Sequence, residues 1–444
     1  MDTPIHDFIE RYCASGPVRC HMPGHKGRCC DPHDITEIYG SDELYSPSSI
    51  ILESEKNAAR LFGTDATLYS TEGSSQCVKA MLYLCVSLYP QKQRHIITAF
   101  RNVHGSFISA AQLIGFDIDF MFSDSPGILS CPVSPAELDR HLCSMTEKPD
   151  AVYVTSPDYT GATADISGLA EVAHKHGILL VVDNAHGAYL KFLSEDSHPI
   201  TLGADMCCDS AHKTLPALTG GAYLHIHSAL PGVSDALIGN AKKALYLFGS
   251  TSPSWLILES LDLLNSYLAG CSTEFSRFEE TVRRLKDKIA DLGWEITGSD
   301  PFRITVRTTP FGYSGTEVAG ILERSFVFCE LCDPDIIVLM LTPQNSECDL
   351  DRLYHAFSRI RRRAPLDMTP PVINSRPERV FSPREVLFRS AKTVEAEKSL
   401  GMVFAGSVLR CPPAVPLICC GERIDNDVLK LFEYYGIDKT EVVS

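Results

Sequence analysis

Between about residues 50 and 270, short apolar runs alternate with segments of helical periodicity, and this alternation constrains the fold more than any other feature of the chain. Such runs are typical of buried strands, and helices between them are typical of a parallel sheet covered on both faces. The expected strands are His95–Phe100, Phe116–Phe122, Ala151–Ser156, Ile178–Asp183 and Gly221–His227. The expected helices include Ser75–Ser87 and Ile166–His176, the latter capped by Asp165. The sequence therefore predicts an α/β fold with a doubly wound, mainly parallel sheet.

The C-terminal half predicts two smaller domains. Residues 255–292 have a helical pattern, and we expect one long helix that links the large domain to a smaller α+β domain. That smaller domain is expected to contain strands Phe302–Arg307 and Ile336–Leu341 and helices Thr316–Ser325 and Asp349–Arg362. A linker at Pro365, Pro370 and Pro371 then leads to a third unit with a helix at Ser382–Ser390. The expected divisions are an N-terminal arm (1–50), a large domain (51–290), a small α+β domain (291–365) and a C-terminal domain (366–444).

Composition and charge exclude several classes of protein. The net charge of -16 argues against sequence-independent binding to nucleic acid and against binding to anionic membranes, both of which need a basic surface. No apolar stretch is long enough to span a bilayer, and the first residues lack the pattern of a secretory signal. The 17 cysteines are spread over a long chain, so reduced thiols in the cytoplasm are expected rather than a disulfide framework. Only Cys329 and Cys332 have the spacing of metal ligands, and without a second pair no metal site is predicted.

A lysine and an aspartate follow two of the predicted strands. Asp183 ends the apolar run that begins at Ile178, and Lys213 lies thirty positions later in the segment Asp209-Ser210-Ala211-His212-Lys213-Thr214. Pyridoxal phosphate (PLP) requires a lysine that forms a Schiff base and a carboxylate that pairs with its pyridinium nitrogen. Because ligands of doubly wound sheets bind at the carboxyl ends of strands, this pair predicts a PLP site.

Two further segments fit the same site. Thr71-Glu72-Gly73-Ser74-Ser75 precedes a predicted helix, so its amides and hydroxyls are able to hold a phosphate at the helix N-terminus. His104 follows another strand, where an imidazole can stack on the cofactor ring, and Ala185 is small enough to lie against that ring. Each signal alone also has a structural explanation, such as a helix cap or a surface residue. Their common position after the strands of one sheet favours the cofactor.

With these residues, the chain resembles the Orn/Lys/Arg decarboxylases in their short bacterial form, which have the fold type I architecture of aspartate aminotransferase. The resemblance depends on His21-Met22-Pro23-Gly24-His25-Lys26-Gly27, on the segment from Asp34 to Leu44, and on Ser250-Thr251-Ser252-Pro253-Ser254. Ser382-Pro383-Arg384-Glu385 and Pro412-Pro413-Ala414-Val415-Pro416-Leu417 extend it into the C-terminal unit. The chain lacks the N-terminal wing domain of the long decarboxylases, so no decamer is expected.

The resemblance implies a role for each matching residue. Lys213 would be the Schiff-base lysine, Asp183 the pyridinium partner and His104 the stacking imidazole. His186 would lie close to the cofactor in a role that stays open. The residues that would hold the phosphate are Gly73, Ser74, Ser75, Ser210 and His212, together with Ser250 and Thr251 from the other subunit. A homodimer with shared active sites is therefore implied.

The implied reaction is PLP-dependent decarboxylation of a basic amino acid, with arginine expected before lysine and ornithine. Candidates for the carboxylate that binds the cationic substrate tail are Glu37, Asp42, Asp158 and Glu330. Asn184 replaces a usual acidic residue, and Trp255 replaces a commoner tyrosine, which leaves the substrate open. An aminotransferase, a carbon-sulfur lyase and a catalytically silent PLP-binding relative are the alternatives.

Overall fold

The computed structural model describes residues 1–123, 127–372, 376–406 and 415–444. Pro412, Pro413 and Ala414, which contribute to the family resemblance, lie outside these residues. The chain forms two compact units. The first contains residues 1–92, 150–152 and 166–276, and the second contains residues 93–149, 153–165 and 277–444.

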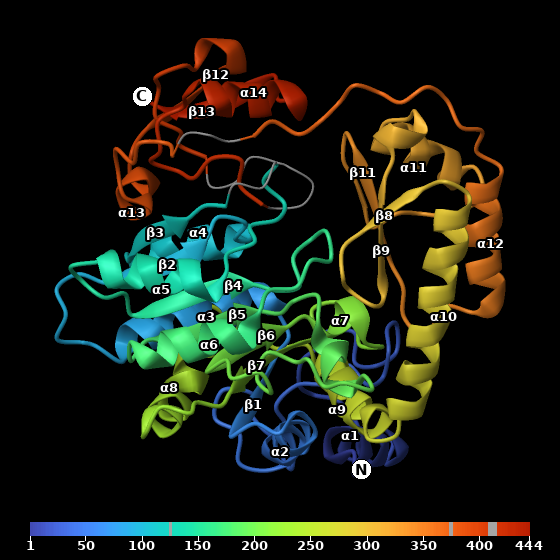
Figure 1. Cartoon of the computed structure of the whole chain (residues 1–444). Helices are drawn as coiled ribbons and strands as arrows, with labels where there is room; N and C mark the ends of the chain where they lie inside the picture. Colours follow the sequence, from blue (N-terminus) through green and yellow to red (C-terminus); the bar gives the residue numbers. More distant parts are fainter. Residues whose placement is uncertain (124–126, 373–375, 407–414) are drawn as a thin grey trace. The chain divides into compact units, whose positions relative to one another are not determined.

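A seven-stranded sheet confirms the predicted α/β class (Figure 1). Its strand order is β1-β7-β6-β5-β4-β2-β3, and β4 contributes residues to both units. The strands are β1 (Ala66–Ser70), β2 (Ile96–Phe100), β3 (Asp117–Met121), β4 (Ala151–Thr155), β5 (Leu179–Asp183), β6 (Met206–Asp209) and β7 (Ala222–Ile226). The pairs β2/β3 and β5/β6 are parallel, whereas β7 is antiparallel to both β1 and β6. The five strands expected from the sequence are present, and β1 and β6 were not predicted.

In the first unit, several helices pack against the strands of the sheet. Helix α2 packs on β1, while α3 packs on β5, β6 and β7, and α6 packs on β5. The helices of this unit are α1 (Pro4–Ala14), α2 (Ile50–Phe62), α3 (Ser74–Ser87), α6 (Ile166–Lys175), α7 (Ala211–Thr214), α8 (Val233–Leu247) and α9 (Trp255–Leu268), with a 3-10 helix η1 (Ala188–Phe192). The predicted helices beginning near Ser75 and at Ile166 are thereby confirmed.

The expected single helix over residues 255–292 is wrong, because α9 ends at Leu268 and α10 begins at Ser272 (α10, Ser272–Asp291). Gly270 lies between them, and glycine disfavours a continuous helix by about 1 kcal/mol relative to alanine. The Cys271 thiol also donates to the Leu268 carbonyl at 3.2 Å, which satisfies a carbonyl that a continuing helix would have used. The hydrophobic period alone does not record this interruption.

The second unit contains the smaller sheets. A four-stranded antiparallel sheet has the order β10-β11-β9-β8, and Figure 1 shows α10 and α12 running along one side of it. Its elements are β8 (Glu295–Thr297), β9 (Arg303–Arg307), η2 (Thr309–Phe311), α11 (Gly315–Glu323), β10 (Leu331–Cys332), β11 (Ile336–Met340) and α12 (Glu347–Ser358). The remaining elements of the unit are α4 (Gly105–Ile114), α5 (Pro135–Ser144), α13 (Pro383–Leu387), β12 (Ala391–Glu395), η3 (Ala396–Lys398), α14 (Asn426–Tyr434) and β13 (Lys439–Val443).

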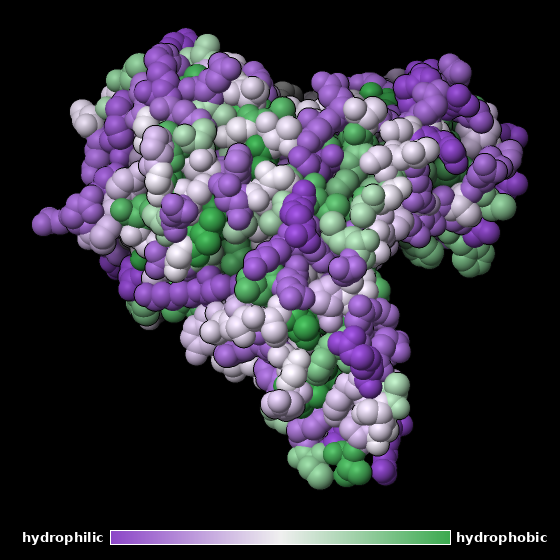
Figure 2. Space-filling model, turned by 90° about the horizontal axis from the view of Figure 1, so that it is seen from below, coloured by the Kyte–Doolittle hydropathy of each residue, from purple (hydrophilic) through white to green (hydrophobic). Residues whose placement is uncertain are grey.

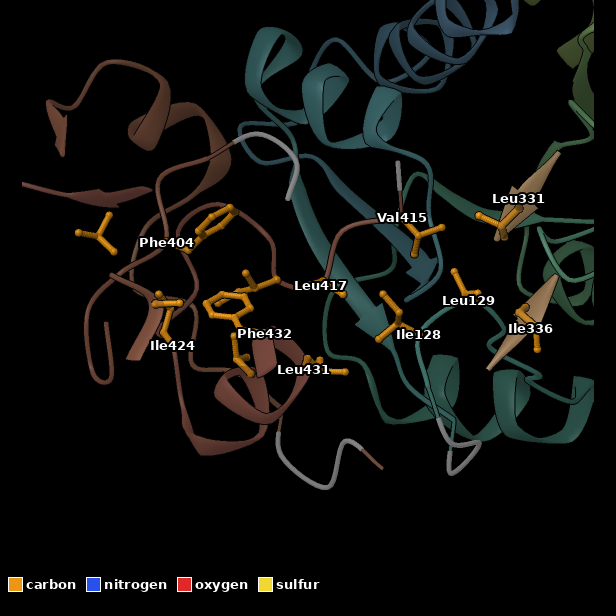
Figure 3. Close-up of a cluster of buried hydrophobic side chains, with 14 of the residues drawn as sticks. Ile128, Leu129, Leu331, Ile336, Phe404, Val415, Leu417, Ile424, Leu431 and Phe432 are labelled. Carbon is orange, nitrogen blue, oxygen red and sulfur yellow. The ribbon is translucent and has the colours of Figure 1, made fainter. Parts of the chain in front are cut away.

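One hydrophobic cluster runs through the second unit (Figure 3). Phe404, Ile424 and Phe432 come from the C-terminal segment, Ile128 lies after β3, and Ile336 begins β11. Each fully buried side chain of this kind contributes about 1.5–3 kcal/mol relative to an exposed one. The C-terminal segment therefore shares a core with residues far from it in the sequence.

The surface is mixed in polarity. In Figure 2, hydrophobic side chains form small groups that hydrophilic side chains interrupt. Large apolar side chains that are exposed include Tyr39, Phe326, Phe328 and Phe388. Within the described part of the chain, no helix is both long and apolar enough to cross a membrane.

The N-terminal helix is held by a buried carboxylate on α9. Asp262 Oδ2 accepts hydrogen bonds from the backbone amides of Ile5 and His6 at 2.9 and 3.0 Å, and Oδ1 accepts from Ser54 Oγ at 2.5 Å. These are orphan amides at the start of α1, so the carboxylate acts as a distant helix cap. Burial nevertheless raises the pKa of Asp262 to about 6, and the carboxylate of Asp7 adds to this.

This raised pKa predicts a pH-dependent stability. An Asp with an ordinary pKa of about 3.9 in the unfolded chain binds fewer protons there than in the fold between pH 4 and 6, so the free energy of unfolding falls as pH rises through this window, by roughly 2–3 kcal/mol. Asp262→Asn keeps an acceptor for both amides and removes the titration. We expect the unfolding free energy of Asp262→Asn minus that of the wild type, both measured by urea denaturation, to increase from pH 4 to pH 7. Asp351→Asn, at an exposed site on α12, is the control, and a pH-independent difference for Asp262→Asn would contradict the prediction.

Candidate active site

The parallel pairing of β5 and β6 brings the central candidates to one edge of the sheet. Asp183 pairs with Cys208 in register, and the Asn184 amide continues the ladder to the Cys208 carbonyl at 3.0 Å. Asp183 therefore ends β5 beside the point where β6 leads into Ser210 and α7. The short helix α7 contains His212 and Lys213.

Lys213 and His186 are in direct contact. Lys213 Nζ lies 2.9 Å from His186 Nε2, and His186 is buried while Lys213 is half-buried. An amine adjoining an imidazole nitrogen is able to pass a proton to it, which a nucleophilic lysine requires. The sequence left the position of His186 relative to the lysine open, because the two residues are 27 positions apart.

Asp183 is held rigidly at the end of β5. Its side chain is 3% exposed, and Oδ1 accepts from the Ala185 amide at 3.2 Å and from the Cys208 thiol at 3.6 Å. Both contacts come from β5, β6 and the turn that follows β5. The carboxylate is therefore oriented by the turn that follows β5 and by a side chain of β6.

The predicted phosphate cradle is an open helix N-terminus. Gly73 is the N-cap of α3 with φ of 73°, no side chain caps the helix, and its first turn carries no acidic residue. Ser210 Oγ donates to Ser74 Oγ at 2.7 Å, so the hydroxyl of the residue that follows β6 meets a hydroxyl of α3. Space beside Gly73 is open, since a Cβ added there would meet nothing within 4 Å. Free amides and paired hydroxyls fit an anionic phosphate, so the residues present fit PLP.

The chain after Lys213 closes onto this cradle. The Gly73 amide donates to the Gly220 carbonyl at 2.8 Å, and a Cβ at Gly220, whose φ is +100°, would lie 2.9 Å from the Thr71 carbonyl oxygen. His212 Nδ1 donates to the Gly221 carbonyl at 3.0 Å. Burial, assisted by the charge of Lys213, lowers the pKa of His212.

The remaining candidates have the following local surroundings. His104 belongs to the second unit, where it caps α4 by accepting the Ser106 amide at Nδ1 at 3.1 Å. Ser250 and Thr251 are exposed in the first unit, and the Ser250 amide donates to the Glu72 carboxylate. Ser75 is half-buried in the first turn of α3.

Two of the four candidate tail carboxylates have structural partners. Asp42 accepts four backbone amides, from Glu43, Ser48, Ser49 and Ile51, at 2.9–3.0 Å. Burial opposes ionisation, but these amides outweigh it and hold the pKa of Asp42 below its ordinary value. Asp158 Oδ1 accepts the Thr160 and Ala162 amides at 2.9 and 3.0 Å, and burial raises its pKa. Both carboxylates are therefore engaged in local backbone structure.

Glu37 and Glu330 are exposed instead. Glu37 lines a pocket of about 460 Å³ in the first unit, together with Tyr45, Tyr246 and Thr251. Glu330 lies in the second unit, where its Oε1 accepts from Tyr159 at 3.1 Å. These two carboxylates remain able to bind a cation.

Comparison with known proteins identifies the family of this chain. A family model described as the major domain of Orn/Lys/Arg decarboxylases matches residues 3–293. The chain belongs to the Orn/Lys/Arg decarboxylase family. It is accordingly a PLP-dependent decarboxylase that acts on a basic amino acid.

Similar proteins span nearly the whole chain. An arginine decarboxylase of Bacillus subtilis is 28% identical over 473 aligned residues, which cover 96% of this chain and 92% of that protein. Among solved structures, lysine decarboxylase A from Pseudomonas aeruginosa has a TM-score of 0.80 at 16% identity and covers 97% of this chain and 75% of its own. The constitutive lysine decarboxylase of Escherichia coli has a TM-score of 0.76 at 16% identity, with 100% and 82% covered. The structural matches establish the fold.

We predict that Asp42 acts in stability and not in substrate binding. Asp42→Ala leaves four backbone amides, two of them at the start of α2, without their acceptor, so the free energy of unfolding is expected to fall by about 2–4 kcal/mol. Asp42→Asn retains one oxygen and is expected to lose less. The measurement is urea denaturation beside steady-state kinetics. A fall in kcat/KM at unchanged stability would instead show that Asp42 contacts the substrate.

Proposed function

We propose that this decarboxylase acts on arginine in preference to lysine and ornithine, at a PLP site centred on Lys213. The observation that carries the site is the contact of Lys213 Nζ with His186 Nε2 at the carboxyl ends of β5 and β6. The preference for arginine is supported by similarity to arginine decarboxylases from several Bacillus species over most of the chain.

Each end of the cofactor has residues able to hold it. Lys213 would bind it covalently, Asp183 would pair with the pyridinium nitrogen, and Ala185 would lie against the ring. The amides and hydroxyls of Ser74 and Ser75 and the hydroxyl of Ser210 would hold the phosphate in the open space beside Gly73, joined by His212.

In this reaction the side chains of the protein transfer protons, and the cofactor accepts the electrons of the broken bond. When bound, PLP supplies the sink that stabilises the carbanion left when the substrate loses carbon dioxide. Lys213 must be neutral to act as a nucleophile, and His186 is placed to accept its proton. After carbon dioxide leaves, Lys213 or a histidine returns a proton to the α-carbon, which gives the amine.

We further propose a homodimer with shared active sites in the cytoplasm. The side chains of Ser250 and Thr251 are exposed, as residues that reach a second subunit must be. Their loop is tied to the phosphate cradle of its own chain through Glu72. A cytoplasmic location suits the cysteines of the described residues, all of which are free thiols.

The reaction is tested with purified protein and PLP. We expect arginine, within a panel of amino acids, to give its primary amine and one equivalent of carbon dioxide, detected by mass spectrometry and by trapping of the gas. Lys213→Ala is expected to lose both the turnover and the visible absorbance of lysine-bound PLP. A keto acid product would indicate an aminotransferase or a lyase. Absence of any amine from basic amino acids would defeat the proposal.

Either Glu37 or Glu330 is available to bind the cationic tail of the substrate. We propose Glu37, because Thr251 lines the same pocket and two tyrosines there are able to contact a guanidinium. Glu37→Gln is expected to lower kcat/KM for arginine by about 10–100-fold, the loss of one charged hydrogen bond. Inhibition by citrulline, a neutral isostere of arginine, should change little.

Matched variants control this experiment. Glu171→Gln, an exposed position on α6, is expected to leave kcat/KM for arginine unchanged. If Glu330→Gln reduces kcat/KM and Glu37→Gln does not, the tail carboxylate is Glu330 and the assignment to Glu37 is wrong.

A further inference from the structure

A buried polar cluster lies directly beside the proposed PLP site. It consists of Asp209, Asn184, His198 and His225, which we call the Asp209 cluster, and each of these side chains is 0% exposed. Asp209 Oδ1 accepts from Asn184 Nδ2 at 2.6 Å, and Oδ2 lies 3.0 Å from His198 Nε2 and 3.2 Å from His225 Nε2. The sequence predicted no role for Asp209.

Hydrogen bonding fixes the protons of this cluster. His198 Nδ1 accepts the Ile200 amide at 3.4 Å, so its proton is on Nε2 and is donated to Asp209. His225 Nδ1 lies 2.8 Å from Thr67 Oγ1, and burial lowers the pKa of His225. Burial by itself raises the pKa of Asp209, but His198 and His225 outweigh it and hold that pKa well below its ordinary value. Asp209 is thus a buried carboxylate stabilised by three donors.

The Asp209 cluster connects the neighbours of two residues that are proposed to bind the cofactor. Asn184 follows Asp183, the residue proposed at the pyridinium nitrogen, and Asp209 precedes Ser210, proposed at the phosphate. The side-chain hydrogen bond between Asn184 and Asp209 therefore lies across β5 and β6, next to both contacts. A shift between these strand ends would change the distance between the two cofactor-binding groups.

The position of the negative charge is consistent with this arrangement. Residue 184, where the family commonly has an acidic residue, is an asparagine in this chain. The carboxylate is found on the neighbouring strand, at residue 209, and contacts residue 184 directly. One carboxylate and one amide are thus paired across the strands, with the charge on β6.

We propose that Asp209 is a positioning residue, which fixes the separation of Asp183 and Ser210 through its hydrogen bond to Asn184 and thereby sets the affinity for PLP. This inference rests on the proposed function of the site. It assigns Asp209 no contact with substrate or cofactor.

Zinc binding is the competing explanation for these side chains. Ligand atoms of His198, Cys207, Asp209 and His225 all lie within 4.8 Å of one another, and such donors bind zinc. However, a proton on His198 Nε2 occupies the position that a metal would need. A cluster held by hydrogen bonds is therefore favoured over a zinc site, and zinc content is measured in the same test.

The test uses the full-length protein freed of PLP and then titrated with PLP. Asp209→Asn is expected to raise the dissociation constant of PLP by about tenfold, which corresponds to one buried hydrogen bond. The exchanged variant Asn184→Asp/Asp209→Asn restores one carboxylate and one amide, so its dissociation constant should return to within about threefold of the wild type. Asp65→Asn, which removes the Asp65–His227 pair at 3.2 Å before β1, is the matched control and should bind PLP as the wild type does.

A second variant covers the case in which Asp209→Asn does not fold. Asn184→Ala removes the same hydrogen bond, leaves Asp209 with both histidines, and is expected to weaken PLP binding to a similar degree. Urea denaturation of the PLP-free proteins separates this effect from general destabilisation.

Several outcomes would overturn the inference. Wild-type affinity for PLP in Asn184→Ala would do so, as would failure of the exchanged variant to recover affinity or one equivalent of zinc in the wild type that Asp209→Asn lacks. If the wild type itself binds no PLP, the proposed function fails as well. The two failures are distinguishable, because failure of the proposed function is measured on the wild type alone, whereas failure of this inference is measured on the variants of a wild type that binds PLP.

Discussion

The pairing of β5 with β6 is the interaction on which the site depends. Parallel strands end at the same edge of a sheet, so Asp183 and the segment that begins at Ser210 are neighbours although 27 positions separate them. The helix α3 packs on both strands and directs its N-terminus toward Ser210, as the contact between the hydroxyls of Ser74 and Ser210 shows. A carboxylate, an amine and an uncapped helix N-terminus are thus brought together by the pairing of these two strands.

Buried carboxylates in this chain are stabilised in different ways, and this decides which of them are available for binding. Asp42 and Asp158 accept backbone amides of nearby turns, and Asp262 accepts the first amides of α1. Asp209 accepts side-chain donors from three separate segments of the chain. Each interaction offsets the cost of removing a charge from water. Glu37 is exposed, and its Oε2 accepts from the hydroxyl of the adjacent Thr36 at 2.7 Å.

Much of the fold was predictable because its main strands are strongly apolar. The run at Leu179–Asp183 and the helix at Ser74–Ser87 have unambiguous periodicity, and both were found within one or two residues of their expected bounds. The strand β6 was not predicted, because it has only four residues and is stabilised by its neighbours β5 and β7 rather than by its own pattern. The break between α9 and α10 was missed for a related reason, since the hydrophobic period continues across Gly270.

The sequence by itself determined the class of the fold, the family and the identity of Lys213 and Asp183 as candidates, because each of these depends on residue types in a fixed order along the chain. Only the tertiary structure decided that His186 contacts Lys213, that the Asp42 carboxylate accepts nearby backbone amides, and that Asp209 pairs with Asn184. Hydrogen bonds have ranges of about 3 Å, and the residues that form them come from separate elements whose approach is set by strand pairing and helix packing. A linear sequence records the donors and acceptors but not which of them meet.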